Sequence, residues 1–219
     1  RAAALVLSCL PSLGDDAPDL MALGGHVEGL EICPAGEADD DGDDEDDDEA
    51  LEQFVSSAKG AAADGEILTI CVFGASGDLA KKKVYPAIFA LFYDRHLPEN
   101  FLVYGYARSK MTTEEFKERI SASLPCRISE AHDCSDRMDE FLSRCFYQAG
   151  QYDDPEDFKA LDEAMKAQEA GRKGMRLFYL SIPPSIFVPV AQNAARHVSM
   201  GEERGPTRVI VEKPFGRDL

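Results

Sequence analysis

Residues 67–83 read ILTICVFGASGDLAKKK and combine the signals of a strand, a glycine turn and the start of a helix. The first seven residues, Ile67–Phe73, are apolar or β-branched throughout, which is typical of a strand buried on both faces. Leu79–Tyr93 then carries apolar residues at helical spacing, and Asp78 at its start would complement the helix dipole. This order predicts the first unit of an α/β fold.

The chain continues to alternate between strand and helix signals after this unit. Further strands are expected at Phe101–Ala107, Met175–Ile182 and Thr207–Glu212. Further helices are expected at Thr112 to about Ser123, Asp136–Phe146, Pro155–Glu169 and Ser185–Val198. Because no tight hairpin joins two strands, we predict a Rossmann-like, doubly wound parallel sheet covered by helices.

The acidic residues are concentrated in the first third of the chain. The net charge of −18 comes from 41 acidic and 23 basic residues, and residues 1–64 hold 18 of the acids but only 2 of the bases. A run of like charge from Glu37 to Glu52 cannot bury enough apolar surface to fold. We therefore expect a disordered acidic leader over residues 1–65, followed by a nearly neutral domain over residues 66–219.

Composition excludes several classes of partner. An acidic chain without a basic stripe is repelled by phosphate backbones and by anionic membrane surfaces, so we expect neither nucleic acid nor a membrane as partner. No window holds the roughly 20 apolar residues that a membrane span requires. A calcium loop around Gly42 is disfavoured, because Glu37 and Asp48 stand where an Asp and a bidentate Glu are expected. We expect no metal site.

The turn GASGDLAKKK, residues 74–83, has the composition of a phosphate-binding loop. Small residues let the backbone approach a pyrophosphate, whose charge meets free N–H groups and the helix dipole. Three consecutive lysines, Lys81–Lys83, add positive charge. A tight strand-to-helix turn without a ligand remains the alternative.

Arg108 ends the second expected strand and bears on the choice of nicotinamide coenzyme. An acid at that position accepts hydrogen bonds from the ribose hydroxyls of NAD, whereas an arginine offers a planar fork to the 2′-phosphate of NADP. The residue therefore favours NADP, with a solvated arginine as the alternative.

Four segments in order resemble glucose-6-phosphate dehydrogenases: Gly74–Lys83, Gly105–Ser109, Leu177–Leu180 with Pro183 and Pro184, and Glu212–Leu219. The resemblance covers about residues 66–219. It implies NADP-dependent oxidation of D-glucose 6-phosphate to 6-phospho-D-glucono-1,5-lactone, the first step of the oxidative pentose phosphate pathway. The alternatives are a non-catalytic NADP-binding protein and a dehydrogenase for another hexose phosphate.

The resemblance also implies roles for individual residues. The coenzyme would be bound by Gly74, Ala75, Ser76, Gly77, Asp78, Leu79, Ala80, Lys81, Arg108, Phe187 and Lys213. The substrate phosphate would be bound by Lys213 and Lys83. The family's catalytic His, in an Arg-Ile-Asp-His-Tyr motif, has no counterpart here, so we expect an N-terminal piece without a catalytic residue, inactive by itself and truncated before the substrate and dimerisation domain. The full-length protein would be a homo-oligomer.

Four of the six cysteines fall into two groups. Cys71 on the first strand and Cys145 on an expected helix face are interpreted as buried small hydrophobes. Cys126 and Cys134 flank a polar loop that a disulfide could close, and a zinc site through His132 would lack a fourth ligand. The pair resembles the regulatory disulfide of plastid glucose-6-phosphate dehydrogenases, which thioredoxin reduces. That implies a chloroplast stroma location, with the cytoplasm as the alternative, and an NADP affinity that changes on reduction.

Overall fold

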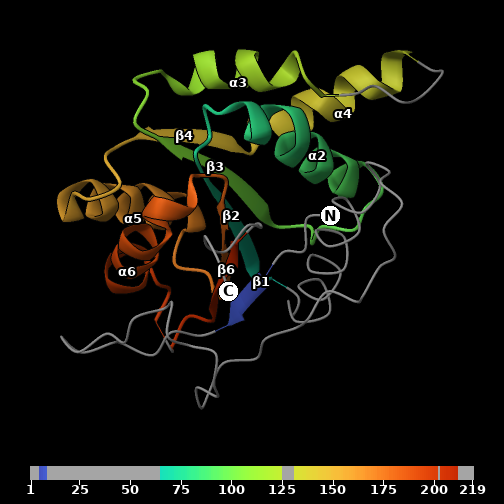
Figure 1. The fold of residues 1–219 in the computed structure, drawn as a ribbon. Coiled ribbons are helices and arrows are strands. Elements are labelled where there is room, and N and C mark those ends of the chain that lie inside the picture. Colours follow the sequence, from blue (N-terminus) through green and yellow to red (C-terminus); the bar gives the residue numbers. More distant parts are fainter. Residues whose placement is uncertain (1–4, 9–64, 125–130, 202, 212–219) are drawn as a thin grey trace, which may run out of the picture.

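A six-stranded sheet forms the middle layer of the part of the chain that the computed structural model describes, residues 5–8, 65–124, 131–201 and 203–211 (Figure 1). Its strands are β1 (Leu5–Ser8), β2 (Ile67–Phe73), β3 (Phe101–Ala107), β4 (Cys145–Ala149), β5 (Gly174–Leu180) and β6 (Thr207–Val211). They lie in the order β1-β6-β5-β2-β3-β4.

Five of the strands, β2 to β6, are parallel, which confirms the predicted α/β fold class. β1 pairs with β6 in the antiparallel direction, with Leu5 opposite Val211. This strand lies within the segment that the sequence assigned to the acidic leader, and no sequence pattern predicted it. β1 therefore contradicts the expected disorder for residues 5–8. Residues 1–4 and 9–64 lie outside the described part, so their expected disorder stays a prediction.

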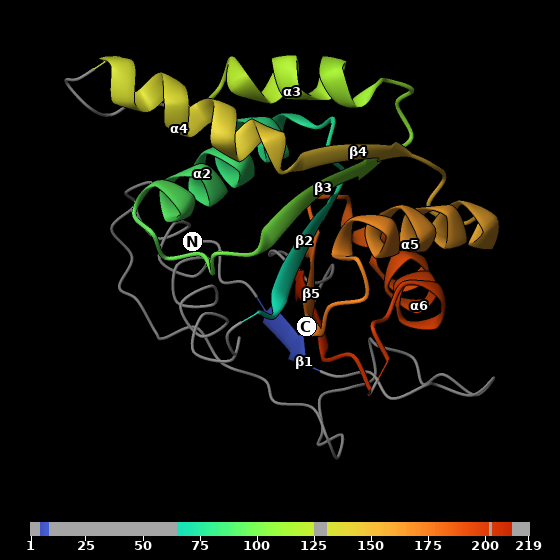
Figure 2. The same cartoon turned by 180° about the vertical axis from the view of Figure 1, so that it is seen from behind.

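Helices cover both faces of the sheet (Figure 2). One face carries the π-helical turn η1 (Ala80–Val84), α2 (Tyr85–Tyr93), α3 (Thr113–Ser121) and α4 (Ala131–Ser143). The other carries α5 (Pro155–Glu169) and α6 (Phe187–His197), which follows the 3₁₀ turn η2 (Pro184–Ile186). None of the described helices is long and apolar enough to cross a membrane.

The two layers explain why β2 lacks polar alternation. Ile70 and Val72 pack into the core beneath α2, α3 and α4, while Cys71 and Phe73 pack into the core beneath α5 and α6. Each side chain of the strand therefore leaves water whichever face it points to, which favours an uninterrupted apolar run.

Local sequence signals place two of the helix starts. Thr112 caps α3 through a reciprocal pair of bonds, in which its hydroxyl accepts from the Glu115 N–H and its own N–H donates to the Glu115 carboxylate. Asp154 caps α5 by accepting from the Glu156 N–H, with Pro155 in the first turn. These caps satisfy donors that have no partner within the helix.

The expected helix over Asp136–Phe146 is wrong at both ends. The helix α4 begins at Ala131 and ends at Ser143, and Cys145 begins the strand β4. Cys145 is therefore on a strand opposite Val103 and not on a helix face, although its predicted burial is confirmed at 0% exposure. The strand follows the helix after one residue, and its partner is distant in sequence, so no local signal separates the two elements.

A buried ion network joins β5 to α5 near the amino ends of the strands. The Arg176 guanidinium is fully buried and donates to Glu169 at 2.8 Å and to Asp162 at 2.6 Å. The Thr69 hydroxyl on β2 also donates to Glu169, at 2.9 Å. These bonds satisfy the buried charges and tie the sheet to its helical layer at the end opposite the glycine turn.

Candidate coenzyme-binding site

The glycine turn lies where the winding of the sheet changes direction. From β2 the chain proceeds outward through β3 to β4, and then crosses to β5 on the other side of β2 and continues to β6. Ligands of open α/β sheets bind outside the carboxyl ends of the strands at such a switch point. The turn after β2 therefore occupies the expected position of a binding crevice.

Gly74 gives the turn its shape. Its φ of +85° lies in the left-handed region, which glycine enters without strain. A Cβ atom at this position would collide with the Ser181 carbonyl oxygen on the turn after β5 and would lie 3.0 Å from Ile182 Cγ2. The glycine thus allows the turn to lie directly against the end of β5.

Backbone bonds hold the loop and leave part of its donors available. The N–H groups of Gly74 and Ala75 donate to the Tyr106 carbonyl at 2.9 and 3.2 Å, and the Gly77 N–H donates to the Gly74 carbonyl at 2.8 Å. Within the described residues, the N–H groups of Ser76, Asp78 and Leu79 make no backbone hydrogen bond. Donors of this kind at a helix start suit a phosphate.

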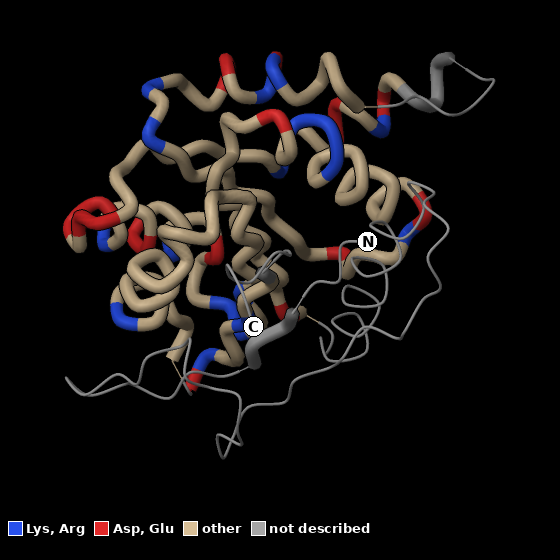
Figure 3. Tube along the Cα trace, viewed as in Figure 1, with Lys and Arg blue, Asp and Glu red and all other residues tan. Residues whose placement is uncertain are grey.

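The lysine cluster Lys81–Lys83 lies on η1, directly after the loop. Figure 3 shows blue Lys and Arg positions on the helical segment that leads into α2. The π-helical turn closes with a bond from the Tyr85 N–H to the Ala80 carbonyl, just before Pro86, which has no N–H to donate. Lys81 and Lys83 are half-buried there, whereas Lys82 lies exposed, 3.9 Å from the Asp78 carboxylate.

Arg108 lies on the neighbouring turn, after β3, and the structure brings this turn against the loop. The Ser109 hydroxyl donates to the Ser76 hydroxyl at 2.9 Å. The Arg108 side chain is exposed, and its guanidinium carbon lies 5.6 Å from the centre of the Tyr152 ring. Among the residues that the structure describes, Arg108 forms no ion pair, so its positive charge remains available beside the loop.

Tyr152 lies beside Arg108 at this candidate site, although no sequence pattern indicated it. It follows β4, and its ring lies 5.9 Å from that of Tyr106. Burial raises the pKa of Tyr152, while the charge of Arg108 and a backbone hydrogen bond from Gly74 partly offset this rise. Because β4 was not predicted, nothing in the sequence indicated that Tyr152 lies at the carboxyl edge of the sheet.

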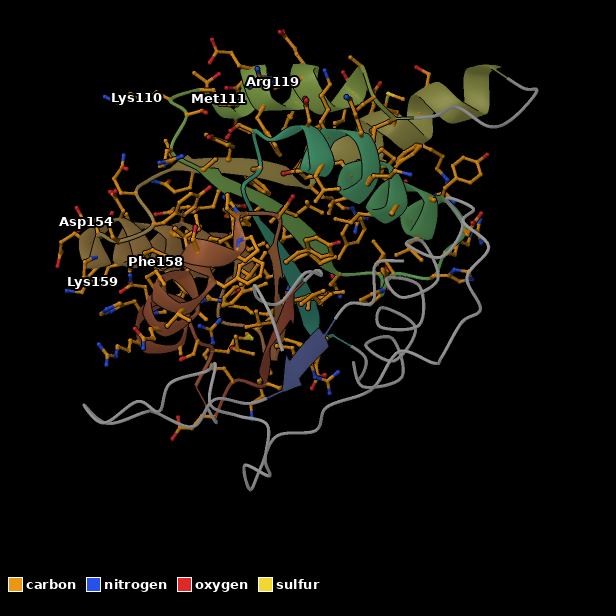
Figure 4. All side chains as sticks on the ribbon, viewed as in Figure 1. Lys110, Met111, Arg119, Asp154, Phe158 and Lys159 are labelled. Carbon is orange, nitrogen blue, oxygen red and sulfur yellow. The ribbon has the colours of Figure 1, made fainter. Side chains whose placement is uncertain are left out.

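The turns after β3 and β4 lie at the same edge of the sheet, where the parallel strands end. Figure 4 shows Lys110 and Met111 after β3, and Asp154 and Phe158 at the start of α5 after β4. The parallel strands thus bring Arg108 and Tyr152 together although 44 positions separate them in the chain.

The other predicted site residues lie partly inside and partly outside the described part of the chain. Phe187 begins α6 after the turn that follows β5, and it is partly buried against the core beneath α5 and α6. Lys213 and Cys126 lie outside the described residues. Cys134 lies on α4 and not in the expected polar loop, which corrects that expectation. The side chain of Cys134 is not described, so the disulfide with Cys126 stays a prediction. No group of residues in the described ranges has the make-up of a metal site.

Residues 71–219 match the family model described as "Glucose-6-phosphate dehydrogenase, NAD binding domain". The chain belongs to this family. Over 151 residues it is 57% identical to the chloroplastic glucose-6-phosphate 1-dehydrogenase 1 of Arabidopsis thaliana and 56% identical to the chloroplastic enzyme of Spinacia oleracea. These alignments cover 69% of this chain and 26% of each relative, so the chain spans about a quarter of the relatives' length.

A solved structure, titled as glucose-6-phosphate dehydrogenase in complex with its substrate glucose-6-phosphate, has the same fold. The superposition has a TM-score of 0.64 at 39% identity and covers 72% of this chain and 32% of that chain. The region matched to the dehydrogenase family includes the glycine turn, Arg108 and Tyr152.

The residues present at this site fit a phosphorylated dinucleotide. The positive-φ glycine brings the loop close to the sheet, N–H groups are available at the helix start, and an exposed arginine lies beside them. These are the donors that a pyrophosphate and a further phosphate require.

Proposed function

We propose that this chain is the NADP-binding part of a plastid enzyme that oxidises D-glucose 6-phosphate to 6-phospho-D-glucono-1,5-lactone. Membership of the dehydrogenase family and the names of the chloroplastic relatives support the reaction, the substrate and the location. The observation that carries the choice of NADP is the exposed Arg108, joined through Ser109 to the phosphate loop.

In this proposal, loop residues Gly74–Lys81 hold the pyrophosphate and Arg108 binds the 2′-phosphate. NADP supplies the hydride acceptor when bound. The bonds from Gly74 and Ala75 to the Tyr106 carbonyl hold the loop in place. The remaining N–H groups of the loop are therefore ordered before a phosphate binds, so little further ordering is required. The Arg108 fork contributes a charged donor pair that a ribose hydroxyl cannot use equally well.

Further parts of the proposal concern the sugar and the regulation of the enzyme. Lys83 and Lys213 are proposed to bind the phosphate of glucose 6-phosphate, and Phe187 to lie beside the nicotinamide. Cys126 and Cys134 are proposed to form a disulfide that thioredoxin reduces, with a change in NADP affinity. The assembled enzyme is proposed to be a homo-oligomer in the stroma.

The decisive experiment replaces Arg108 by alanine and measures the binding of NADP and NAD by isothermal titration. Loss of a charge-assisted bond weakens NADP binding about 10- to 100-fold and changes NAD binding less than about twofold. Arg172→Ala is the matched control, because Arg172 is also exposed but precedes β5, at the amino end of the strands. A wild-type chain that binds neither nucleotide, or an equal loss for both in Arg108→Ala, contradicts the proposal.

The redox proposal has its own test. Thiol labelling and mass spectrometry of the oxidised chain are expected to reveal a peptide pair linked through Cys126 and Cys134, which reduced thioredoxin separates. The NADP dissociation constant is expected to change at the same step. Absence of the linked pair, or an unchanged dissociation constant after its reduction, overturns this regulation while leaving coenzyme binding unaffected.

A further inference from the structure

Tyr147 on β4 contacts the backbone on both sides of Arg108. Its hydroxyl lies 2.5 Å from the Ser109 carbonyl oxygen and 3.3 Å from the Ala107 carbonyl oxygen. A phenol has one proton to donate, so the shorter contact is the main hydrogen bond and the longer one is secondary. One side chain of the neighbouring strand thus spans the residue that carries the exposed guanidinium.

Tyr147 is itself held from several directions. Its N–H donates to the Thr113 hydroxyl at 3.2 Å, and its ring centre lies 5.2 Å from that of Phe116 on α3. The residue is 8% exposed. Burial raises the pKa of Tyr147 to about 12, so its phenol remains a protonated donor at neutral pH.

The same turn is tied to the phosphate loop through its other polar group. The Ser109 carbonyl accepts from Tyr147, while the Ser109 hydroxyl donates to Ser76. Ser109 therefore links Tyr147 on β4 to Ser76 in the loop through two hydrogen bonds, and Arg108 is its neighbour in the sequence. These bonds can position Arg108 without a ligand contacting the Tyr147 hydroxyl or the Ser109 carbonyl.

We propose that Tyr147 is a positioning residue for coenzyme selectivity, whose hydroxyl holds the Arg108 turn in the orientation that meets a 2′-phosphate. The inference rests on the proposed function of this site. A planar guanidinium binds a phosphate well only when its two N–H donors point toward the phosphate oxygens. Ordering the backbone that carries it costs conformational entropy on binding, and a turn that is already fixed avoids this cost. Ligands without the 2′-phosphate gain nothing from that ordering.

The test uses adenosine 2′,5′-bisphosphate and 5′-AMP as probes, titrated into the whole 219-residue chain by calorimetry. Tyr147→Phe removes the hydroxyl and keeps the ring that packs on Phe116. We expect it to weaken binding of the bisphosphate about three- to tenfold and to change 5′-AMP binding by less than about twofold. Far-UV circular dichroism verifies that the variant is folded.

Tyr104→Phe is the matched control. Tyr104 is also a buried tyrosine of the sheet, and its hydroxyl donates to a backbone carbonyl, that of Ala164 on α5, at 2.8 Å. This bond lies in the helical layer beneath the other face of the sheet, away from the Arg108 turn. Loss of a buried phenol hydroxyl is the same in both variants, so only an effect on Arg108 distinguishes them.

A double variant separates positioning from general stability. If Tyr147 acts through Arg108, Tyr147→Phe has no further effect on bisphosphate binding in the Arg108→Ala background. An equal loss for both probes, a Tyr147→Phe result that matches the control, or full additivity with Arg108→Ala overturns the inference. A wild-type chain that does not prefer the bisphosphate to 5′-AMP instead overturns the proposed function.

Discussion

Replacing Gly74 by alanine tests whether the turn is shaped by close packing as well as by backbone conformation. The new Cβ would overlap the Ser181 carbonyl oxygen and would approach Ile182 Cγ2 at 3.0 Å. The Ser181 N–H also donates to the Phe73 carbonyl at 2.9 Å, so relief of the overlap displaces a bond that joins the ends of β2 and β5. The substitution therefore has two separate costs.

Both costs can be given a magnitude. A left-handed backbone costs an L-residue other than glycine roughly 1–2 kcal/mol. Forcing an extra carbon into a packed site adds about 1–3 kcal/mol. We expect Gly74→Ala to lower the free energy of unfolding by about 2–5 kcal/mol, a large part of the roughly 5–15 kcal/mol typical of a domain.

Gly171→Ala isolates the first cost. Gly171 has a φ of +74°, close to that of Gly74, but a Cβ there would meet nothing within 4 Å. We expect this variant to lose only about 1–2 kcal/mol, leaving a difference of about 1–3 kcal/mol between the two.

The measurement is urea unfolding followed by far-UV circular dichroism, since the chain has no tryptophan to report by fluorescence. With a slope near 2 kcal/mol/M, the midpoint of Gly74→Ala lies about 0.5–1.5 M below that of Gly171→Ala. Equal midpoints for the two variants would refute the argument from packing against Ser181. A Gly171→Ala midpoint equal to that of the wild type would refute the cost assigned to the positive φ.

Two further predictions concern buried groups. Glu169→Gln removes a countercharge from the buried Arg176. We expect it to lower the free energy of unfolding by about 3–5 kcal/mol at neutral pH, as measured by urea unfolding. Lys159→Ala, on the exposed side of α5, is the control and should change the free energy of unfolding little. Burial alone would raise the pKa of Glu169, but hydrogen bonds and charge from Arg176 lower it below its ordinary value. The ionised Glu169 therefore stabilises the folded chain above the unfolded-state pKa, and this stability is lost as the pH falls through the lower folded-state pKa. If the stability of Glu169→Gln fell with acid as steeply as that of the wild type, this reasoning would be wrong. Burial raises the pKa of the Cys71 and Cys145 thiols, so both should resist alkylation in the folded chain and react only in urea. Peptide mass spectrometry locates the label, and rapid labelling at Cys71 or Cys145 in the native protein would disprove their burial.

The sequence was sufficient for the elements whose signals are local. The apolar run Ile67–Phe73, the glycine turn and the helix starts at Thr112 and Pro155 each depend on a few neighbouring positions, so they could be predicted without knowing the neighbours in space. The α/β class and the location of the glycine turn at the end of β2 follow from them.

Sequence patterns failed where a partner distant in the chain decides the structure. β4 is five residues long and follows α4 after a single residue, and it exists as a strand because β3 offers it a parallel edge. β1 likewise depends on β6, more than 190 positions away. Neither pairing leaves a local pattern that could be recognised.

The candidate site divides along the same line. By itself the sequence determined the loop, the lysines and the presence of an arginine after the second strand, because these follow from residue type and order. Only the tertiary structure brought Tyr152 beneath Arg108 and the Tyr147 hydroxyl to the Ser109 carbonyl, since both tyrosines reach the turn from β4 and its following residues. Parallel strands align their carboxyl ends at one edge, and that alignment, which no short segment encodes, brings these side chains into contact.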